Sequence, residues 1–181
     1  DPDKTRAAFD EEGFFKMGDA VTFADPKRPE AGLRFAGRIA EQFKLVTGTW
    51  VSAGTLRAQL VAACAPWVRD VVICGINESF IAALIWPNLS ACSQLVAGVE
   101  ADVFTSDAVM AKICAGLAAH NAQNPASSQS IKRFSLLTTP PSLGDGEITE
   151  KGYVNQGLVQ RLRADDVALL FGENHPSVMV V

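Results

Sequence analysis

The apolar residues of this chain fall in short runs, and the spacing within each run predicts a mixture of strands and helices. Three runs are rich in β-branched and aromatic residues, and we expect them to form one sheet; they cover residues 68–74, 79–87 and 131–137. Other runs place apolar residues three and four positions apart, which is typical of helices. We therefore expect an α+β fold, with helices packed on a sheet of about three strands.

Helical spacing predicts four helices. Ser52 is expected to cap a helix over residues 55–65, and Ser106 to begin a longer one that runs past Leu117. A short helix over residues 89–96 and a terminal helix over residues 154–170, closed by Gly172, complete the set. Residues 121–130 are expected to form a loop, and residues 143–147 an exposed, flexible one. Residues 174–181 are a tail to which the sequence assigns no helix or strand.

The beginning of the chain has a different pattern. A polar segment ends in a turn composition at residues 10–13, and short alternating runs follow at residues 21–24 and 33–35. The turn formers of residues 25–32 lie between these runs, so we expect a β-hairpin. Residues 43–46 are expected to form a further strand.

Composition and charge exclude several classes of function. The 181 residues are 48% hydrophobic, which is enough to bury one substantial core. The net charge of −4 gives no basic surface for nucleic acid, and no apolar run is long enough to span a membrane. We expect a cytoplasmic protein, and because the sequence starts at Asp1 we interpret it as a piece of a longer one.

Cysteine, histidine and tryptophan do not indicate a site. The cysteines occur singly in apolar contexts, so we expect buried thiols and neither a metal site nor disulfides; they are Cys64, Cys74, Cys92 and Cys114. His120 and His175 are far apart and are expected to face solvent. Trp50, Trp67 and Trp86 are expected in the core.

Three positions carry candidate chemistry. Asp19 follows Gly18 at the start of a strand, where a carboxylate can accept hydrogen bonds from paired hydroxyls or satisfy its own turn. Arg38 follows Gly37 and offers a fork of donors to phosphate or carboxylate, or a surface partner for Glu41. Lys151 precedes Gly152, and is either a solvated lysine or one that enters a partner cleft to neutralise charge.

In combination, these positions resemble the carboxy-terminal part of the adenylate-forming superfamily, which includes the acyl-CoA synthetases. The segment 15–19 is similar to the family's aromatic-Arg-Thr-Gly-Asp motif, residues 37–51 resemble the motif at the interdomain hinge, and residues 148–152 occupy the place of the late Thr-x-x-Gly-Lys signature. Within the superfamily, residues 43–52 and 147–156 look most like the feruloyl-CoA synthase group.

The resemblance implies a role for each candidate residue. Asp19 would bind the ribose hydroxyls of ATP, Arg38 would contact the nucleotide, and Lys151 would bridge the substrate carboxylate and the α-phosphate. The hinge would lie at Ala40, and Lys44 and Gly48 would face coenzyme A after the small domain rotates.

The sequence departs from the family pattern at three places. Ala40 stands where the hinge residue is usually Asp or Lys, and one extra residue lies between Lys44 and Gly48. An ungapped match on Gly152 puts Tyr153 at the position of the family's lysine, and Lys151 lies two positions before it.

The resemblance implies an ATP- and Mg²⁺-dependent acid–CoA ligase acting on an aromatic acid such as ferulate. Residues 1–38 would end its large AMP-binding domain, residues 39–181 would form the lid, and the missing large domain would be the lid's partner and hold most of the ATP and Mg²⁺ contacts. We expect this piece alone to be inactive. The alternative is a non-catalytic binding or interaction domain that retains the lid fold, which the departures at Ala40 and Lys151 motivate.

Overall fold

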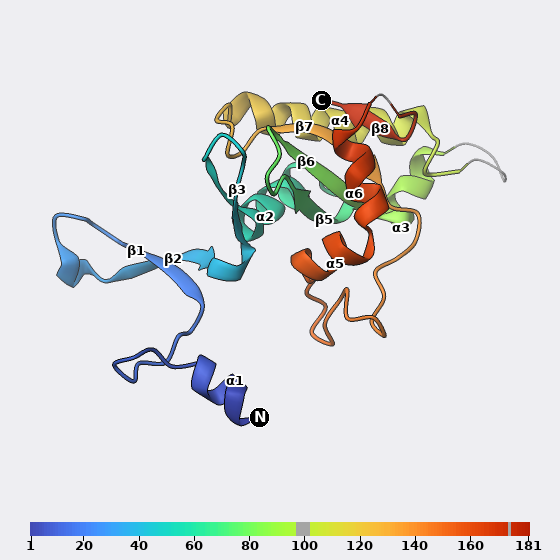
Figure 1. Cartoon of the computed structure of the whole chain (residues 1–181). Coiled ribbons are helices and arrows are strands. Elements are labelled where there is room, and N and C mark those ends of the chain that lie inside the picture. Colours follow the sequence, from blue (N-terminus) through green and yellow to red (C-terminus); the bar gives the residue numbers. More distant parts are fainter. Residues whose placement is uncertain (97–101, 174) are drawn as a thin grey trace. The chain divides into compact units, whose positions relative to one another are not determined.

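The computed structural model describes residues 1–96, 102–173 and 175–181, and the chain divides into two compact units (Figure 1). The first unit is Asp1–Ala40 and the second is Glu41–Val181. The predicted α+β class is confirmed, because both units contain helices and strands.

The first unit contains the predicted hairpin. β1 (Asp19–Phe23) pairs antiparallel with β2 (Leu33–Arg38), and the 3-10 helix η1 (Pro29–Ala31) lies in the connection between them. A helix that the sequence did not predict, α1 (Pro2–Ala7), opens the unit. It forms because Pro2 suits the first turn of a helix and the Asp1 carboxylate accepts hydrogen bonds from the Asp3 and Lys4 amides.

The second unit is built on a four-stranded sheet, where the sequence predicted about three strands. Its order is β5 (Val68–Cys74), β6 (Ile81–Pro87), β7 (Ile131–Leu136), β8 (Val178–Val180). Only β6 and β7 run parallel; the other pairs are antiparallel. The fourth strand comes from the tail, to which the sequence assigned no element. Three residues are too few to show a strand period.

Helices cover both faces of this sheet. α2 (Ala53–Ala63) and α4 (Asp107–Gln123) pack on one face, and α5 (Gln156–Leu162) and α6 (Ala164–Phe171) pack on the other. Alternate residues of one strand enter different cores, since Val71 and Ile73 join the first cluster and Val72 and Cys74 the second. Burial on both faces explains why the strand runs are continuously apolar.

Several predicted boundaries differ from the structure. The terminal helix is broken at Arg163 into α5 and α6, because Arg163 leaves the helical conformation, with a ψ of 40°. α4 extends to Gln123, into the segment expected to be a loop. The short helix after β6 is α3 (Leu89–Cys92) followed by the 3-10 helix η3 (Ser93–Leu95).

A second hairpin precedes the sheet. β3 (Gln42–Lys44) overlaps the strand expected over residues 43–46 and pairs antiparallel with β4 (Trp50–Ser52), a strand that the sequence did not predict. The 3-10 helix η2 (Ile39–Glu41) comes before β3. The connection lies against the turn after β5, because the Val46 amide donates to the Glu78 carbonyl at 2.9 Å.

Two expectations about single side chains were wrong, and one was confirmed in part. His120 is buried with 5% exposure because it lies on the same face of α4 as Ile113 and Leu117, and its Nε2 lies 3.1 Å from the Gln129 carbonyl oxygen. Trp50 is 60% exposed rather than in the core, because it lies on the outer side of β4. Burial raises the pKa of the Cys64 thiol to about 11 and that of Cys74 to about 12; Cys92 is also buried and Cys114 is half-buried.

The helix contact at Gly116 gives a test of this packing. A methyl group there would lie 2.8 Å from the Ala63 carbonyl oxygen and 2.9 Å from the Cys64 sulfur. Overpacking of this kind costs about 1–3 kcal/mol, against about 1 kcal/mol that alanine gains over glycine in a helix. We therefore expect Gly116→Ala to lower the free energy of unfolding measured in urea.

Gly157→Ala in α5 is the matched control, because nothing lies within 4 Å of a methyl group there. This variant should leave stability unchanged or raise it by up to about 1 kcal/mol. Equal stability of the two variants would contradict the close approach of α2 and α4.

Candidate functional site

Lys151 lies at the tip of a tight turn. The Gly152 amide donates to the Thr149 carbonyl at 2.8 Å, and the Thr149 amide donates to the Tyr153 carbonyl at 2.9 Å. Gly152 has a φ of +79°, a conformation that glycine adopts without strain. One bridge between Ile148 and Val154 closes the turn, so a short hairpin presents an exposed lysine.

We call residues 147–149 the first arm of this turn and residues 153–156 the second. A buried ion pair lies at the base of the first arm. Arg163 Nε is 2.6 Å from Glu147 Oε1, and Arg163 Nη2 is 2.8 Å from Glu147 Oε2. The side chain of Glu147 is 4% exposed and that of Arg163 is 13% exposed. The expectation of an exposed loop was therefore wrong at Glu147. A carboxylate can be buried when both its oxygens accept hydrogen bonds from one guanidinium group.

The ion pair also organises the loop before the turn. The Ser142 amide donates to Glu147 Oε2 at 2.8 Å, and Arg163 Nη2 donates to the Pro140 carbonyl at 3.1 Å. The Arg163 guanidinium lies 5.3 Å from the centre of the Trp86 ring. The hydrogen bonds from Arg163 outweigh the effect of burial and hold the pKa of Glu147 below its usual range.

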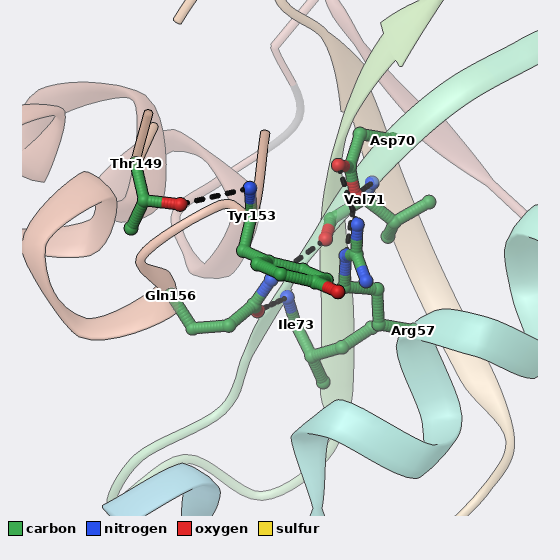
Figure 2. A network of polar contacts seen from close by, with 7 residues as sticks. All are labelled: Arg57, Asp70, Val71, Ile73, Thr149, Tyr153 and Gln156. Carbon is green, nitrogen blue, oxygen red and sulfur yellow. Dashed lines mark hydrogen bonds and ion pairs between the residues drawn. The ribbon is translucent and has the colours of Figure 1, made fainter. Parts of the chain in front are cut away.

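The second arm of the turn is fixed by Gln156. Its Oε1 accepts from the Ile73 amide and its Nε2 donates to the Val71 carbonyl, both at 2.9 Å (Figure 2). β5 is an edge strand of the sheet, so these two backbone groups face outward from the ladder. The buried Gln156 amide therefore completes the hydrogen bonding of this edge, as a neighbouring strand would.

A second ion pair lies next to this contact. Arg57 of α2 binds Asp70 of β5 through two parallel hydrogen bonds of 2.5 and 2.6 Å (Figure 2). Asp70 Oδ1 also accepts from the Val71 amide at 2.7 Å. This pair joins α2 to the sheet and makes no hydrogen bond to either arm of the Lys151 turn among the contacts of the described residues.

Asp19 and Arg38 come together in the first unit. They are partners across β1 and β2, and both side chains are exposed. Gly18 and Gly37 beside them have φ values of +76° and +100°, and the Ile39 amide donates to the Gly18 carbonyl at 2.8 Å. The cross-strand register thus places a carboxylate and a guanidinium at the same end of one ribbon.

The remaining predicted residues lie around η2 and the β3–β4 hairpin. Lys44 Nζ is 4.8 Å from the centre of the exposed Trp50 ring. Gly48 has a φ of +82° in the hairpin connection, where its amide donates to the Leu45 carbonyl at 2.9 Å. Ala40 is exposed and is the last residue of the first unit. The roles given to these residues stay predictions.

Sequence reasoning missed Glu147, Gln156 and Arg163. No local pattern identifies them, because Glu147 and Arg163 are 16 positions apart and Gln156 binds β5 across more than 80 positions. Within the described residues, no group of three or more His, Cys, Asp or Glu side chains is placed to hold a metal ion, and no helix is long and apolar enough to cross a membrane.

Comparisons with known proteins identify the fold. The chain is similar to the A domain of carboxylic acid reductase from Segniliparus rugosus in complex with AMP and a co-purified carboxylic acid, with a TM-score of 0.74 at 22% identity over 94% of this chain and 25% of that one. It is similar to ATP-bound MatB from Rhodopseudomonas palustris, with a TM-score of 0.53 at 17% identity over 91% of this chain and 27% of that one.

A third similar structure is the anthranilate CoA ligase AuaEII in complex with anthranoyl-AMP, with a TM-score of 0.55 at 19% identity over 92% of this chain and 27% of that one. No protein-family model and no curated protein matches the sequence. The chain thus shares the fold of one part of these structures and spans about a quarter of their length.

The lowered pKa of Glu147 predicts a pH dependence of stability. The carboxylate contributes fully above its unfolded pKa of about 4.3, and this contribution is lost as the pH falls through the lower pKa of the folded state. At pH 7, Glu147→Gln should lower the free energy of unfolding by about 3–5 kcal/mol, because it leaves Arg163 buried without its charge partner. The difference from the wild type should shrink below about pH 4.

Urea unfolding between pH 3 and pH 7 measures this difference. Glu150→Gln, which changes an exposed carboxylate in the same turn, is the control and should stay within about 0.5 kcal/mol of the wild type at pH 7. A Glu147→Gln difference that stays constant down to pH 3 would contradict the ion pair.

Proposed function

We propose that this chain is the carboxy-terminal part of an ATP- and Mg²⁺-dependent enzyme that activates a carboxylic acid as its acyl-adenylate and transfers the acyl group to coenzyme A. The acid is aromatic, such as ferulate. The observation that carries the proposal is the exposed Lys151 on a hydrogen-bonded turn, in a fold shared with structures that hold AMP, ATP or anthranoyl-AMP.

Lys151 acts in the first step. Attack of the acid carboxylate on the α-phosphate brings two anions together, and an ammonium group between them stabilises the charge that develops. A lysine at the tip of this turn can enter a cleft of the large domain, since Gly152 has no side chain and both neighbours, Glu150 and Gly152, are exposed. Asp19 binds the ribose hydroxyls and Arg38 contacts the nucleotide.

The apolar face of the first unit supports its assignment to the large domain. Val21 pairs with Phe35 and Phe23 pairs with Leu33, so four apolar side chains share one face of the ribbon. All four are exposed in the structure. A two-stranded ribbon of this kind needs a packing partner for stability, and the remainder of a large AMP-binding domain supplies one for residues 1–38.

Residues 39–181 act as the lid in the second step. Rotation about Ala40 withdraws Lys151 and brings Lys44 and Gly48 toward coenzyme A. The large domain holds most of the ATP and Mg²⁺ contacts and the acid pocket. The likeness to carboxylic acid reductase A domains supports the adenylation step, which precedes any choice of acyl acceptor.

Replacement of Lys151 tests the function. In the full-length protein, Lys151→Ala should lower acid-dependent ATP–pyrophosphate exchange by about 100-fold or more, because charge stabilisation of this kind contributes about 2.7–4 kcal/mol. Lys112→Ala removes an exposed lysine of α4 and is the matched control. Unchanged exchange in Lys151→Ala would favour the alternative, a non-catalytic binding domain, which Tyr153 at the family's lysine position and Ala40 at the hinge support.

A further inference from the structure

The geometry points to Glu147 and Gln156 as positioning residues that hold the two arms of the Lys151 turn at fixed places on the core. This inference rests on the proposed function of Lys151. Neither residue is hydrogen-bonded to Lys151, and both lie outside residues 148–152, which carry the late motif. Each acts through the backbone of the turn.

The first anchor acts through Glu147. Its carboxylate binds Arg163 and the Ser142 amide, and its own carbonyl accepts from the Asn155 amide at 2.8 Å. Glu147 therefore connects the start of the first arm to α5, where Asn155 is the cap residue. The side chain and the backbone of one residue hold both arms together at the base.

The second anchor acts through Gln156. Its side chain is bonded twice to the outer edge of β5, and Asn155 beside it caps α5 by accepting from the Leu158 amide at 3.2 Å. The second arm thus ends on the central sheet, while the first ends on the buried ion pair. Figure 2 shows the Gln156 contact to β5 and the hydrogen bond that the Tyr153 amide donates to Thr149 Oγ1.

The turn needs both anchors because its own bonds are few. Three hydrogen bonds lie within residues 148–154, and the tip is exposed to solvent. A charge stabilises a transition state best when it is already in position and costs no reorganisation. A displacement of about 1 Å lowers a rate by about 100-fold, so the anchors determine whether Lys151 is effective.

Acid-dependent ATP–pyrophosphate exchange in the full-length protein tests this inference. Glu147→Gln should lower kcat by about 10- to 100-fold and leave KM for ATP nearly unchanged, because the contact with Lys151 forms in the transition state. In the Lys151→Ala background, Glu147→Gln should have no further effect. Gln156→Met, which keeps the volume and loses the amide, should behave in the same way.

Asp70→Asn is the matched control, because it makes the same carboxylate-to-amide change in the other two-bond ion pair of this unit. It should leave kcat within about 2-fold of the wild-type value, because sites that share no contact act independently. The inference is overturned if Glu147→Gln lowers kcat equally with and without Lys151, if it has no effect, or if Asp70→Asn has the same effect. Arg163→Lys replaces Glu147→Gln if the latter does not fold, since it keeps the charge and loses the fork.

Amide hydrogen exchange on the same variants separates this inference from the proposed function. Glu147→Gln should speed exchange at Thr149, Gly152 and Tyr153 more than Asp70→Asn does, with exchange in β6 unchanged. If Lys151→Ala keeps full activity, the proposed function fails, and the exchange rates still decide whether Glu147 holds the turn. Unchanged exchange in the turn would overturn the anchoring.

Discussion

The buried ion pair between Glu147 and Arg163 is the contact on which the organisation of the carboxy-terminal half depends. A carboxylate with 4% exposure is stable there only because both its oxygens are bonded to a guanidinium and one also accepts from a backbone amide. Because Arg163 also separates α5 from α6, the same residue breaks the terminal helix and anchors the loop before the Lys151 turn. A buried charge pair and a solvent-exposed lysine are thereby connected within one short segment.

The sheet supplies the fixed reference for this segment. β6 is buried along its whole length, with helices on both faces, so it has little freedom to shift. The edge strand β5 would present unpaired backbone groups, and Gln156 satisfies two of them. The turn is thus joined to the edge of the buried sheet, while its tip is exposed. A base held by buried contacts and an exposed tip suit the role proposed for Lys151.

The sequence predicted the parts of the fold in which a local period is long enough to recognise. The strands of residues 68–74 and 131–137 and the helices beginning near Ala53 and at Asp107 are close to their predicted places. The strand Val178–Val180 was missed because three residues carry no period, and Trp50 was misplaced because hydrophobicity does not say which side of a strand faces the core. For the site, motif order predicted Asp19, Arg38 and Lys151, and their roles stay predictions. Glu147, Arg163 and Gln156 are defined only by contacts between distant positions.

The most direct test of the account is a crystal structure of the full-length protein bound to a non-hydrolysable acyl-adenylate analogue in its adenylating state. In that structure, Lys151 Nζ should lie within hydrogen-bond distance of the acyl and phosphate oxygens, with the Glu147–Arg163 pair intact and Asp19 on the ribose. A structure in which Tyr153 or another residue fills that position, with Lys151 in solvent, would contradict it.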